Sequence, residues 1–289
     1  MLYLGAQRYK ILVRNQYLCK NTTRMKILIT NDDGYKAKGI QTLVRTMKKY
    51  GEITVVAPKH HQSGMSMAVS LGKLIAVKDL GFEDGVHRYY VDGTPASCVK
   101  YAIDELFTPQ TWPDVVLSGI NHGSNASTAM WYSGTIGAAR ESCLVGIPSI
   151  GVSLDNMSHD ADFSAVEELF PAIFEQLMAV YPKGGRVIYN VNFPDLPASR
   201  IKGVRVCVQG DMLWEKEFVH PSELGIDDIP PLEDGERIFM MAGTPVPGDN
   251  PAESDNIALE EGYIAITPQA ISNTDFDEYR RLQHIGFSL

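Results

Sequence analysis

The sequence predicts an α/β fold of three layers, in which helices cover both faces of a Rossmann-like, mostly parallel sheet. Two observations lead to this fold class. Short apolar segments typical of buried strands alternate with segments of helical periodicity, and the alternation runs from about residue 26 to residue 191. The 289 residues are enough for one sizeable core, and 44% hydrophobic with 21% charged residues is ordinary for a globular protein.

The elements follow one another in a regular order. The first strand is predicted at residues 26–30, and apolar residues at helical spacing predict a helix up to Met47. A second strand covers 53–57, and Thr94 with Pro95 fits the N-cap and first position of the next helix. Strands at 114–118, 149–153 and 186–191 alternate with helices at 135–145 and 162–180. Such alternation requires crossover connections, so these strands are expected to be parallel.

Three regions are predicted along the chain. Residues 1–24 form a basic leader without the apolar run of a secretory signal, and we expect a disordered tail or an upstream-start artefact. Residues 25–211 form the Rossmann-like core, and residues 212–289 form a β-rich C-terminal extension that packs on another subunit. Within the extension, strands at 237–241 and 263–267 are expected to pair with each other, and a helix is expected at 275–283.

Charge and cysteine usage narrow the function classes. A net charge of −9 argues against binding to a nucleic acid polymer, which requires a basic surface. No apolar run of about 18 residues is present, so no membrane span is expected. No two of the four cysteines form a CxxC pair, and we expect reduced core residues in a cytoplasmic protein. These cysteines are Cys19, Cys98, Cys143 and Cys207.

Polar residues follow the first strand, at the carboxyl edge where parallel sheets bind ligands. They are Asn31, Asp32, Asp33 and Gly34. Adjacent carboxylates at a buried strand end repel each other, and a hard cation such as Mg²⁺ or Mn²⁺ would remove that cost. A helix N-cap followed by an Asp-Gly turn explains the same residues equally well.

The loop after the second strand adds one oxygen donor. Ser63 offers a neutral oxygen ligand, and Gly64 allows the loop to close over a substrate. The two neighbouring histidines, His60 and His61, are expected to face solvent rather than a ligand. By itself this segment is a common loop sequence.

The loop after the third strand has the features of an anion site. Asn121 offers a carbonyl oxygen, Asn125 offers an amide, and glycines allow backbone N–H groups to approach an anion. Further on, Ser133, Gly134 and Thr135 precede or begin a helix whose N-terminus suits a phosphate. Ser133 as a simple N-cap is the competing interpretation. Another residue of the loop, His122, is a candidate general acid because its ordinary pKa lies near neutrality, with loop packing as the alternative.

Six motifs in order and spacing resemble the SurE family over about residues 25–270. They are Thr30-Asn31-Asp32-Asp33-Gly34, Ala57-Pro58 with Ser63-Gly64, Gly93-Thr94-Pro95-Ala96, Ser118-Gly119-Ile120-Asn121, Asn125, and Tyr132-Ser133-Gly134-Thr135. A late Gly262-Tyr263 with Thr267-Pro268 also resembles the family. Two departures are Ser97, where the family carries an acid, and Ala126-Ser127, where it carries a second glycine.

The resemblance implies one divalent metal cation per subunit, Mg²⁺ or Mn²⁺, held by Asp32, Asp33, Ser63 and Asn121. It implies 5′- and 3′-nucleotidase activity on a small-molecule nucleotide substrate, in some members with exopolyphosphatase activity. It also implies a homodimer or homotetramer built partly by exchange of the C-terminal arm.

Our mechanistic hypothesis is metal-activated water attack, with Asp32 or Asp33 accepting the proton of the water. The predicted phosphate contacts are Asn31, Gly64, Asn125, Ser133, Gly134 and Thr135. Two alternatives remain open. An aspartyl-phosphate route uses Asp-x-Asp after the first strand, which Asn31-Asp32-Asp33 does not match. A module that only senses nucleotide or phosphate would bind its ligand without turnover.

Overall fold

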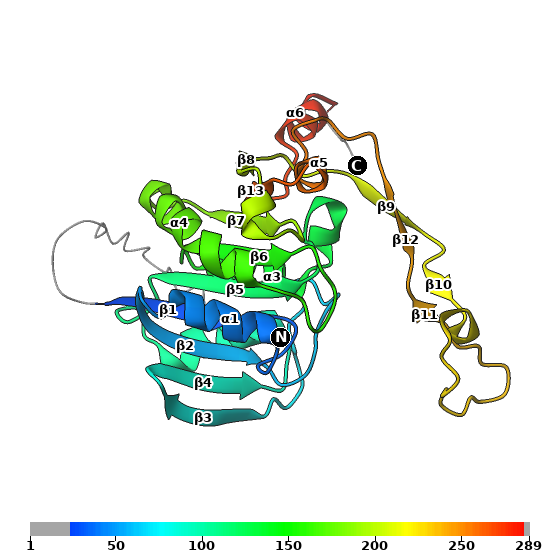
Figure 1. Ribbon diagram of the computed structural model, residues 1–289, viewed down its shortest axis with the longest axis horizontal. Helices are drawn as coiled ribbons and strands as arrows, with labels where there is room; N and C mark the ends of the chain where they lie inside the picture. Colours follow the sequence, from blue (N-terminus) through cyan, green and yellow to red (C-terminus); the bar gives the residue numbers. More distant parts are fainter. Residues whose placement is uncertain (1–23, 286–289) are drawn as a thin grey trace.

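The structure is a computed structural model that describes residues 24–285 of the chain, so the predictions for residues 1–23 lie outside it. Its centre is a nine-stranded sheet in the order β3-β4-β2-β1-β5-β6-β7-β13-β8 (Figure 1). The six strands from β4 to β7 in that order are mutually parallel, whereas β3 and β13 run antiparallel to their neighbours β4 and β7. The predicted α/β class and mostly parallel sheet are confirmed.

The five strands predicted for the core are present. They are β1 (Met25–Thr30), β2 (Gly51–Pro58), β5 (Val115–His122), β6 (Ser149–Leu154) and β7 (Val187–Phe193). Because β1 lies between β2 and β5, the loops that follow these three strands leave the sheet side by side. That order brings the three polar segments of the sequence to one stretch of the sheet edge.

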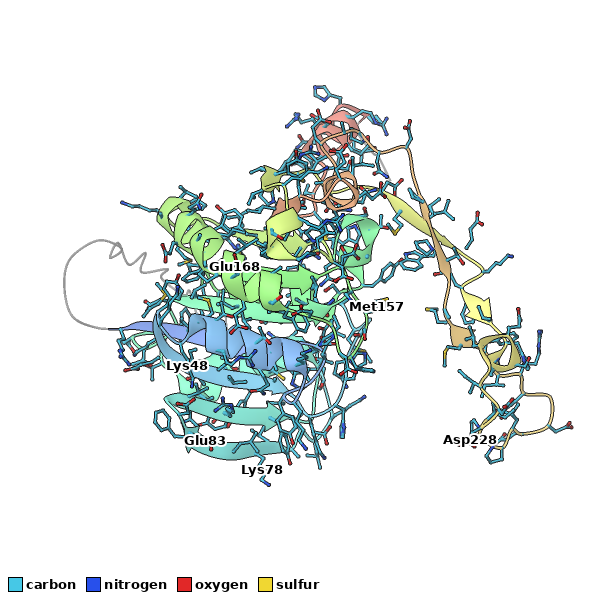
Figure 2. All side chains as sticks on the ribbon, in the orientation of Figure 1. Lys48, Lys78, Glu83, Met157, Glu168 and Asp228 are labelled. Atoms are coloured by element: carbon cyan, nitrogen blue, oxygen red, sulfur yellow. The ribbon has the colours of Figure 1, made fainter. Side chains whose placement is uncertain are left out.

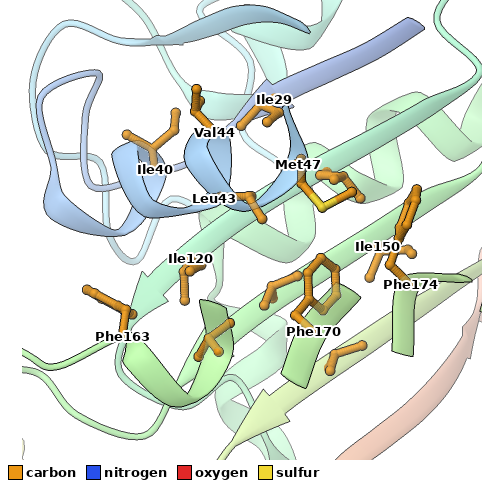
Figure 3. Packing of buried hydrophobic residues seen from close by; sticks show 14 of the residues in the cluster. Ile29, Ile40, Leu43, Val44, Met47, Ile120, Ile150, Phe163, Phe170 and Phe174 are labelled. Atoms are coloured by element: carbon orange, nitrogen blue, oxygen red, sulfur yellow. The ribbon is translucent and has the colours of Figure 1, made fainter. Parts of the chain in front are cut away.

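Helices cover the two faces of the sheet, as the alternation of side chains along a strand requires. Ile27 and Ile29 of β1 belong to one apolar cluster with residues of α1 (Lys38–Met47) and α4 (Ser164–Val180), and Figure 3 shows Ile29 beside Val44 of α1. Leu28 belongs to the cluster on the other face. That second cluster involves α2 (Pro95–Tyr101) and α3 (Gly134–Leu144). Short helical turns add η1 (Ala102–Leu106), η2 (Ser127–Trp131), η3 (Ala198–Arg200) and η4 (Pro221–Leu224).

The sheet is wider than the sequence predicted. The hairpin β3 (Val77–Glu83) and β4 (Val86–Val91) adds two strands beyond β2, and no strand was predicted there. Most residues of β3 are exposed at the sheet edge, so they lack the apolar pattern that marks a buried strand.

The far side of the sheet is completed from the C-terminal region. The strand expected at 263–267 is β13 (Ile264–Ala270), and it pairs with β7 and with β8 (Val204–Val206). Its predicted pairing with 237–241 is therefore wrong. The boundary predicted at residue 211 does not separate sheet from extension, because β13 lies inside the central sheet.

An antiparallel ribbon projects from the body and ends far from the sheet (Figure 1). We call residues 212–247 the arm; it contains β9 (Met212–Glu215), β10 (Phe218–Val219), β11 (Met240–Met241) and β12 (Thr244–Pro247). Asp228 lies near its far end (Figure 2). After the arm come α5 (Asp255–Glu260) and, after β13, α6 (Phe276–Ile285), which confirms the expected terminal helix.

The cysteines and the helices of the described residues can be compared with the sequence. Cys98, Cys143 and Cys207 are buried free thiols, as expected, while Cys19 lies outside the described residues. Among helices built from residues 24–285, none combines the length and apolarity that a bilayer crossing needs.

Candidate metal and phosphate site

Asp32 lies two residues after the end of β1 and is almost entirely buried, with 2% of its surface exposed. The backbone N–H of Thr135 donates to its Oδ2 at 3.1 Å, and the Thr135 hydroxyl donates to its Oδ1 at 2.6 Å. Burial, together with the neighbouring charge of Asp33, raises the pKa of Asp32 from 3.8 to about 6, although the two bonds from Thr135 oppose the rise. A carboxylate in this state gains from any cation that replaces its lost water.

Asp33 lies beside Asp32 and faces two other segments. Its Oδ2 accepts the backbone N–H of His122 at 3.1 Å, and its Oδ1 lies 3.4 Å from Nδ1 of His61. The side chain of Asp33 is only 8% exposed, whereas that of His61 is 61% exposed. His61 therefore faces solvent, as expected, and at the same time reaches the candidate site, which its place in the sequence did not indicate.

Asn121 reaches the same place from β5. Its Oδ1 lies 3.5 Å from the Thr135 hydroxyl, and its Nδ2 donates to the carbonyl of Gly123 at 2.8 Å. The pairing of β5 with β6 is interrupted between Ser118 and Asn121. A Cβ on Gly119 in this bulge would lie 2.2 Å from the carbonyl oxygen of Val152, so only glycine fits there. Side-chain oxygens of Asn121 and Asp32 thus converge on one hydroxyl.

Ser63 is brought near the site by the preceding residue, Gln62. The N–H of Gln62 donates to the backbone carbonyl of Asp32 at 2.7 Å, which places the second loop against the first. Ser63 and Gly64 are exposed, and Gly64 has a φ of 76°, a conformation that favours glycine, with open space beside its Cα. The structure thus brings together Asp32, Asp33 and Asn121, and Ser63 follows Gln62, which contacts the backbone of Asp32.

The residues predicted to contact phosphate have mostly structural partners. Asn31 closes the turn, since its Nδ2 donates to the Gly34 carbonyl and its Oδ1 accepts the Gly34 N–H. The hydroxyl of Ser133 accepts the Ile136 N–H at 3.1 Å, which is the N-cap role that competed with phosphate binding. Their phosphate contacts remain predictions.

Gly134 and Asn125 complete this comparison. A Cβ on Gly134 would lie 2.8 Å from Cβ of Asp32, so this residue must be glycine for the helix start to approach the acid. Asn125 donates from Nδ2 to the Ser153 hydroxyl at 2.8 Å, and its N–H donates to Oδ1 of Asn192 at 2.8 Å. Asn192 was missed, although two buried asparagines two residues apart in an apolar strand, Asn190 and Asn192, are a readable signal.

The ring of His122 is fixed beside the site. Its Nδ1 lies 2.8 Å from the carbonyl oxygen of Ser158, and its ring packs edge-on against Phe163 with centroids 4.9 Å apart. Loop packing, the competing interpretation, therefore describes the contacts of this side chain. Met157 lies nearby, beside the carboxyl ends of the strands (Figure 2), and is 85% exposed. A Cβ on Gly123 would lie 3.2 Å from Cγ of Met157.

Fold and site together define an α/β protein with an acidic, oxygen-rich centre at the carboxyl edge of a parallel sheet. The family model for Survival protein SurE matches residues 27–216, and the chain belongs to the SurE family. It is 39% identical over 251 residues to 5′-nucleotidase SurE of Christiangramia forsetii, covering 86% of this chain and 92% of the relative. The relative of the same name from Syntrophobacter fumaroxidans is 37% identical, with 91% and 98% covered.

A solved structure agrees with the fold. The SurE protein from Aquifex aeolicus superposes with a TM-score of 0.70 at 25% identity, covering 90% of this chain and 99% of that one. The resemblance seen in the motifs therefore extends to the fold.

Proposed function

We propose that the protein is a metal-dependent phosphomonoesterase that hydrolyses nucleoside 5′-monophosphates, and 3′-monophosphates as well, to nucleoside and phosphate. The names of the SurE relatives support nucleotide monophosphates as the substrate class. The observation that carries the proposal is the convergence of Asp32 and Asn121 on the hydroxyl of Thr135, with Asp33 adjacent.

The residues present fit a divalent cation. Asp32 and Asp33 are neighbouring carboxylates with little solvent, and within residues 24–285 neither forms an ion pair with Lys or Arg. In that part of the chain no three His, Cys, Asp or Glu side chains are grouped as a metal site, so neutral oxygens from Ser63 and Asn121 would complete the set. Oxygen donors suit Mg²⁺ or Mn²⁺.

When bound, such a cation supplies charge that stabilises the phosphoryl oxygens and lowers the pKa of a water molecule. The protein contributes the positions of the donors. Thr135 fixes both oxygens of Asp32, and the His122 N–H fixes one oxygen of Asp33. We assign the proton of the attacking water to Asp33, because its Oδ1 faces His61, an exposed imidazole that can pass the proton to solvent.

The phosphate is expected to lie at the N-terminus of α3. The N–H of Thr135 already donates to Asp32, and the N–H of Ile136 already donates to Ser133. The N–H of Gly134 is therefore the donor of the first turn that can bind the phosphate. The positive end of the helix dipole adds to its effect. Gly64 and Asn125 are proposed to contact the same phosphate from the two flanking loops.

Two imidazoles compete for the role of general acid toward the leaving alkoxide. His122 was predicted, but its Nδ1 contacts the Ser158 carbonyl, so only Nε2 can act. His61 is close to Asp33 and exposed. Replacing each by Gln and recording kcat against pH separates them: the acid is the residue whose loss removes the alkaline limb of the profile.

The aspartyl-phosphate alternative is disfavoured by the contacts of Asp32, because both its oxygens accept hydrogen bonds and the group is buried. The test is hydrolysis of a panel of 5′- and 3′-monophosphates by metal-depleted and metal-restored protein. We expect turnover only after Mn²⁺ or Mg²⁺ is restored, and a loss of orders of magnitude in Asp32→Asn. Intact substrates under all conditions refute the enzyme proposal, and a borohydride-trapped phosphoryl-enzyme refutes water attack.

We also propose that the arm forms a homodimer or homotetramer and that the protein works in the cytoplasm. Large apolar side chains of the arm are exposed, among them Leu213, Phe218 and Met241. A ribbon with this composition gains stability by packing on a second copy. The buried free thiols of the described residues agree with a reducing compartment.

A further inference from the structure

We infer that Asp255 is a positioning residue that ties the loop between β5 and α3 to the root of the arm. Asp255 is the first residue of α5 and contributes nothing directly to the candidate site. Its kinetic consequence rests on the proposed function, whereas its structural consequence can be measured without it.

A single buried carboxylate joins four segments. Asp255 is 0% exposed. Its Oδ1 accepts the N–H groups of Ser127 at 2.9 Å, Gly210 at 2.9 Å and Asn256 at 3.0 Å, and its Oδ2 accepts the Thr267 hydroxyl at 3.1 Å. Two of the partners are 128 and 45 residues away in sequence. The carboxylate thus holds together η2, the residues before the arm, the start of α5 and β13.

The chemistry of these partners calls for an acceptor at this position. All four donors point at Asp255, and within residues 24–285 no Lys, Arg or His forms an ion pair with it. An asparagine could still accept the three N–H groups at its oxygen and donate its NH₂ group to the Thr267 hydroxyl, which also accepts hydrogen bonds. Asp255→Ala, by contrast, removes all four bonds.

On one side, Asp255 fixes the loop that carries the proposed phosphate contact. Asn125 is held by Asn192, and two residues later Ser127 is held by Asp255. Ser127 is buried with a φ of 53°, a conformation that residues other than glycine avoid and that persists where the surroundings impose it. The loop therefore has one anchor on β7 and a second on Asp255.

On the other side, Asp255 fixes the point where the arm leaves the body. A Cβ on Gly210 would lie 2.2 Å from Oδ1 of Asn256 and 2.7 Å from the hydroxyl oxygen of Ser127, so these segments are in close contact. The Thr128 hydroxyl also donates to the carbonyl of Met212, the first residue of β9. Displacement of the arm root must therefore disturb the loop. Binding of a partner to the arm is then coupled to the affinity of the loop for phosphate.

The test compares Asp255→Ala with Ser254→Ala. Ser254 is a matched control, because it is the preceding buried residue and its hydroxyl has no partner within the described residues. In Asp255→Ala we expect backbone amides of residues 124–131 and 208–212 to exchange hydrogen at least about tenfold faster. We expect KM for a nucleoside monophosphate to rise at least about tenfold with a smaller fall in kcat, while Mn²⁺ affinity by calorimetry stays unchanged. Ser254→Ala should match the wild type.

Several results overturn the inference. One is unchanged exchange of residues 124–131 in folded Asp255→Ala, and another is an unchanged KM. If that variant does not fold, hydrogen exchange of the wild-type protein provides the test. The amides of Ser127 and Gly210 should then open with the same free energy, and clearly different values refute a shared anchor. Absence of hydrolysis by the wild type would refute the proposed function. The positioning role of Asp255 would then be tested by hydrogen exchange alone.

Discussion

Replacing Thr135 by Val tests how much the hydrogen bond from Thr135 stabilises the buried carboxylate of Asp32. Valine has nearly the same shape, so the change removes the hydroxyl that donates to Asp32 at 2.6 Å and leaves the packing. A hydrogen bond to a charged group is worth about 1.5–3 kcal/mol. Because the hydroxyl stabilises the ionised form, its loss should raise the pKa of Asp32 further above 6.

The sign of the pH dependence follows from the same pKa. Burial raises the pKa of Asp32 in the folded protein from 3.8 to about 6, which corresponds to about 3 kcal/mol against folding once the group is ionised. This unfavourable contribution is complete above about pH 6 and disappears as the pH falls toward 3.8. Thr135→Val removes a bond that offsets it, so the variant should lose about 2 kcal/mol at pH 8 and clearly less at pH 5.

The assay is thermal unfolding of metal-free protein in a chelator at both pH values. A loss of about 2 kcal/mol lowers Tm by about 4–8 °C in a domain of this size. Thr135→Ser keeps the hydroxyl and should restore most of the difference at pH 8. Equal destabilisation at pH 5 and pH 8, with no rescue by serine, would show that Thr135 acts only through packing.

Three further predictions concern the same edge of the sheet and the arm. Protons should compete with the cation at Asp32, so Mn²⁺ affinity by calorimetry should fall about tenfold per pH unit below about pH 6; a flat profile contradicts this. Gly134→Ala, whose Cβ would lie 2.8 Å from that of Asp32, should lower kcat/KM at least about a hundredfold, and wild-type kinetics would exclude the close approach. In the arm, Phe218→Glu with Met241→Glu should shift the mass in light scattering toward the monomer, and an unchanged mass would exclude these side chains from the interface.

Local pattern was sufficient for much of the fold. The apolar run of β1 and the helical spacing in α1 depend on burial of nearby residues, and both elements lie where they were expected. The hairpin of β3 and β4 was not predictable in this way, because an exposed edge strand carries no apolar alternation. The partner of β13 was mispredicted, since pairing with β7 joins segments far apart in sequence and leaves no local signal.

The same distinction holds at the site. The carboxylates and Asn121 were predicted because each follows a strand whose carboxyl end reaches one edge of the sheet. The bond from Thr135 to Asp32 spans 103 residues, and the one from Ser127 to Asp255 spans 128. Such bonds depend on how elements dock, so residue type and spacing could place the candidate ligands at one edge of the sheet but could not indicate the side chains that hold them.

A crystal structure with Mn²⁺, read by anomalous scattering, tests the proposed cation site most directly. We predict one anomalous peak per subunit in contact with oxygen atoms of Asp32, Asp33, Ser63 and Asn121, and no such peak in Asp32→Asn. A peak held by other residues, or an equal peak in the variant, would contradict the proposal that these loops together bind a cation.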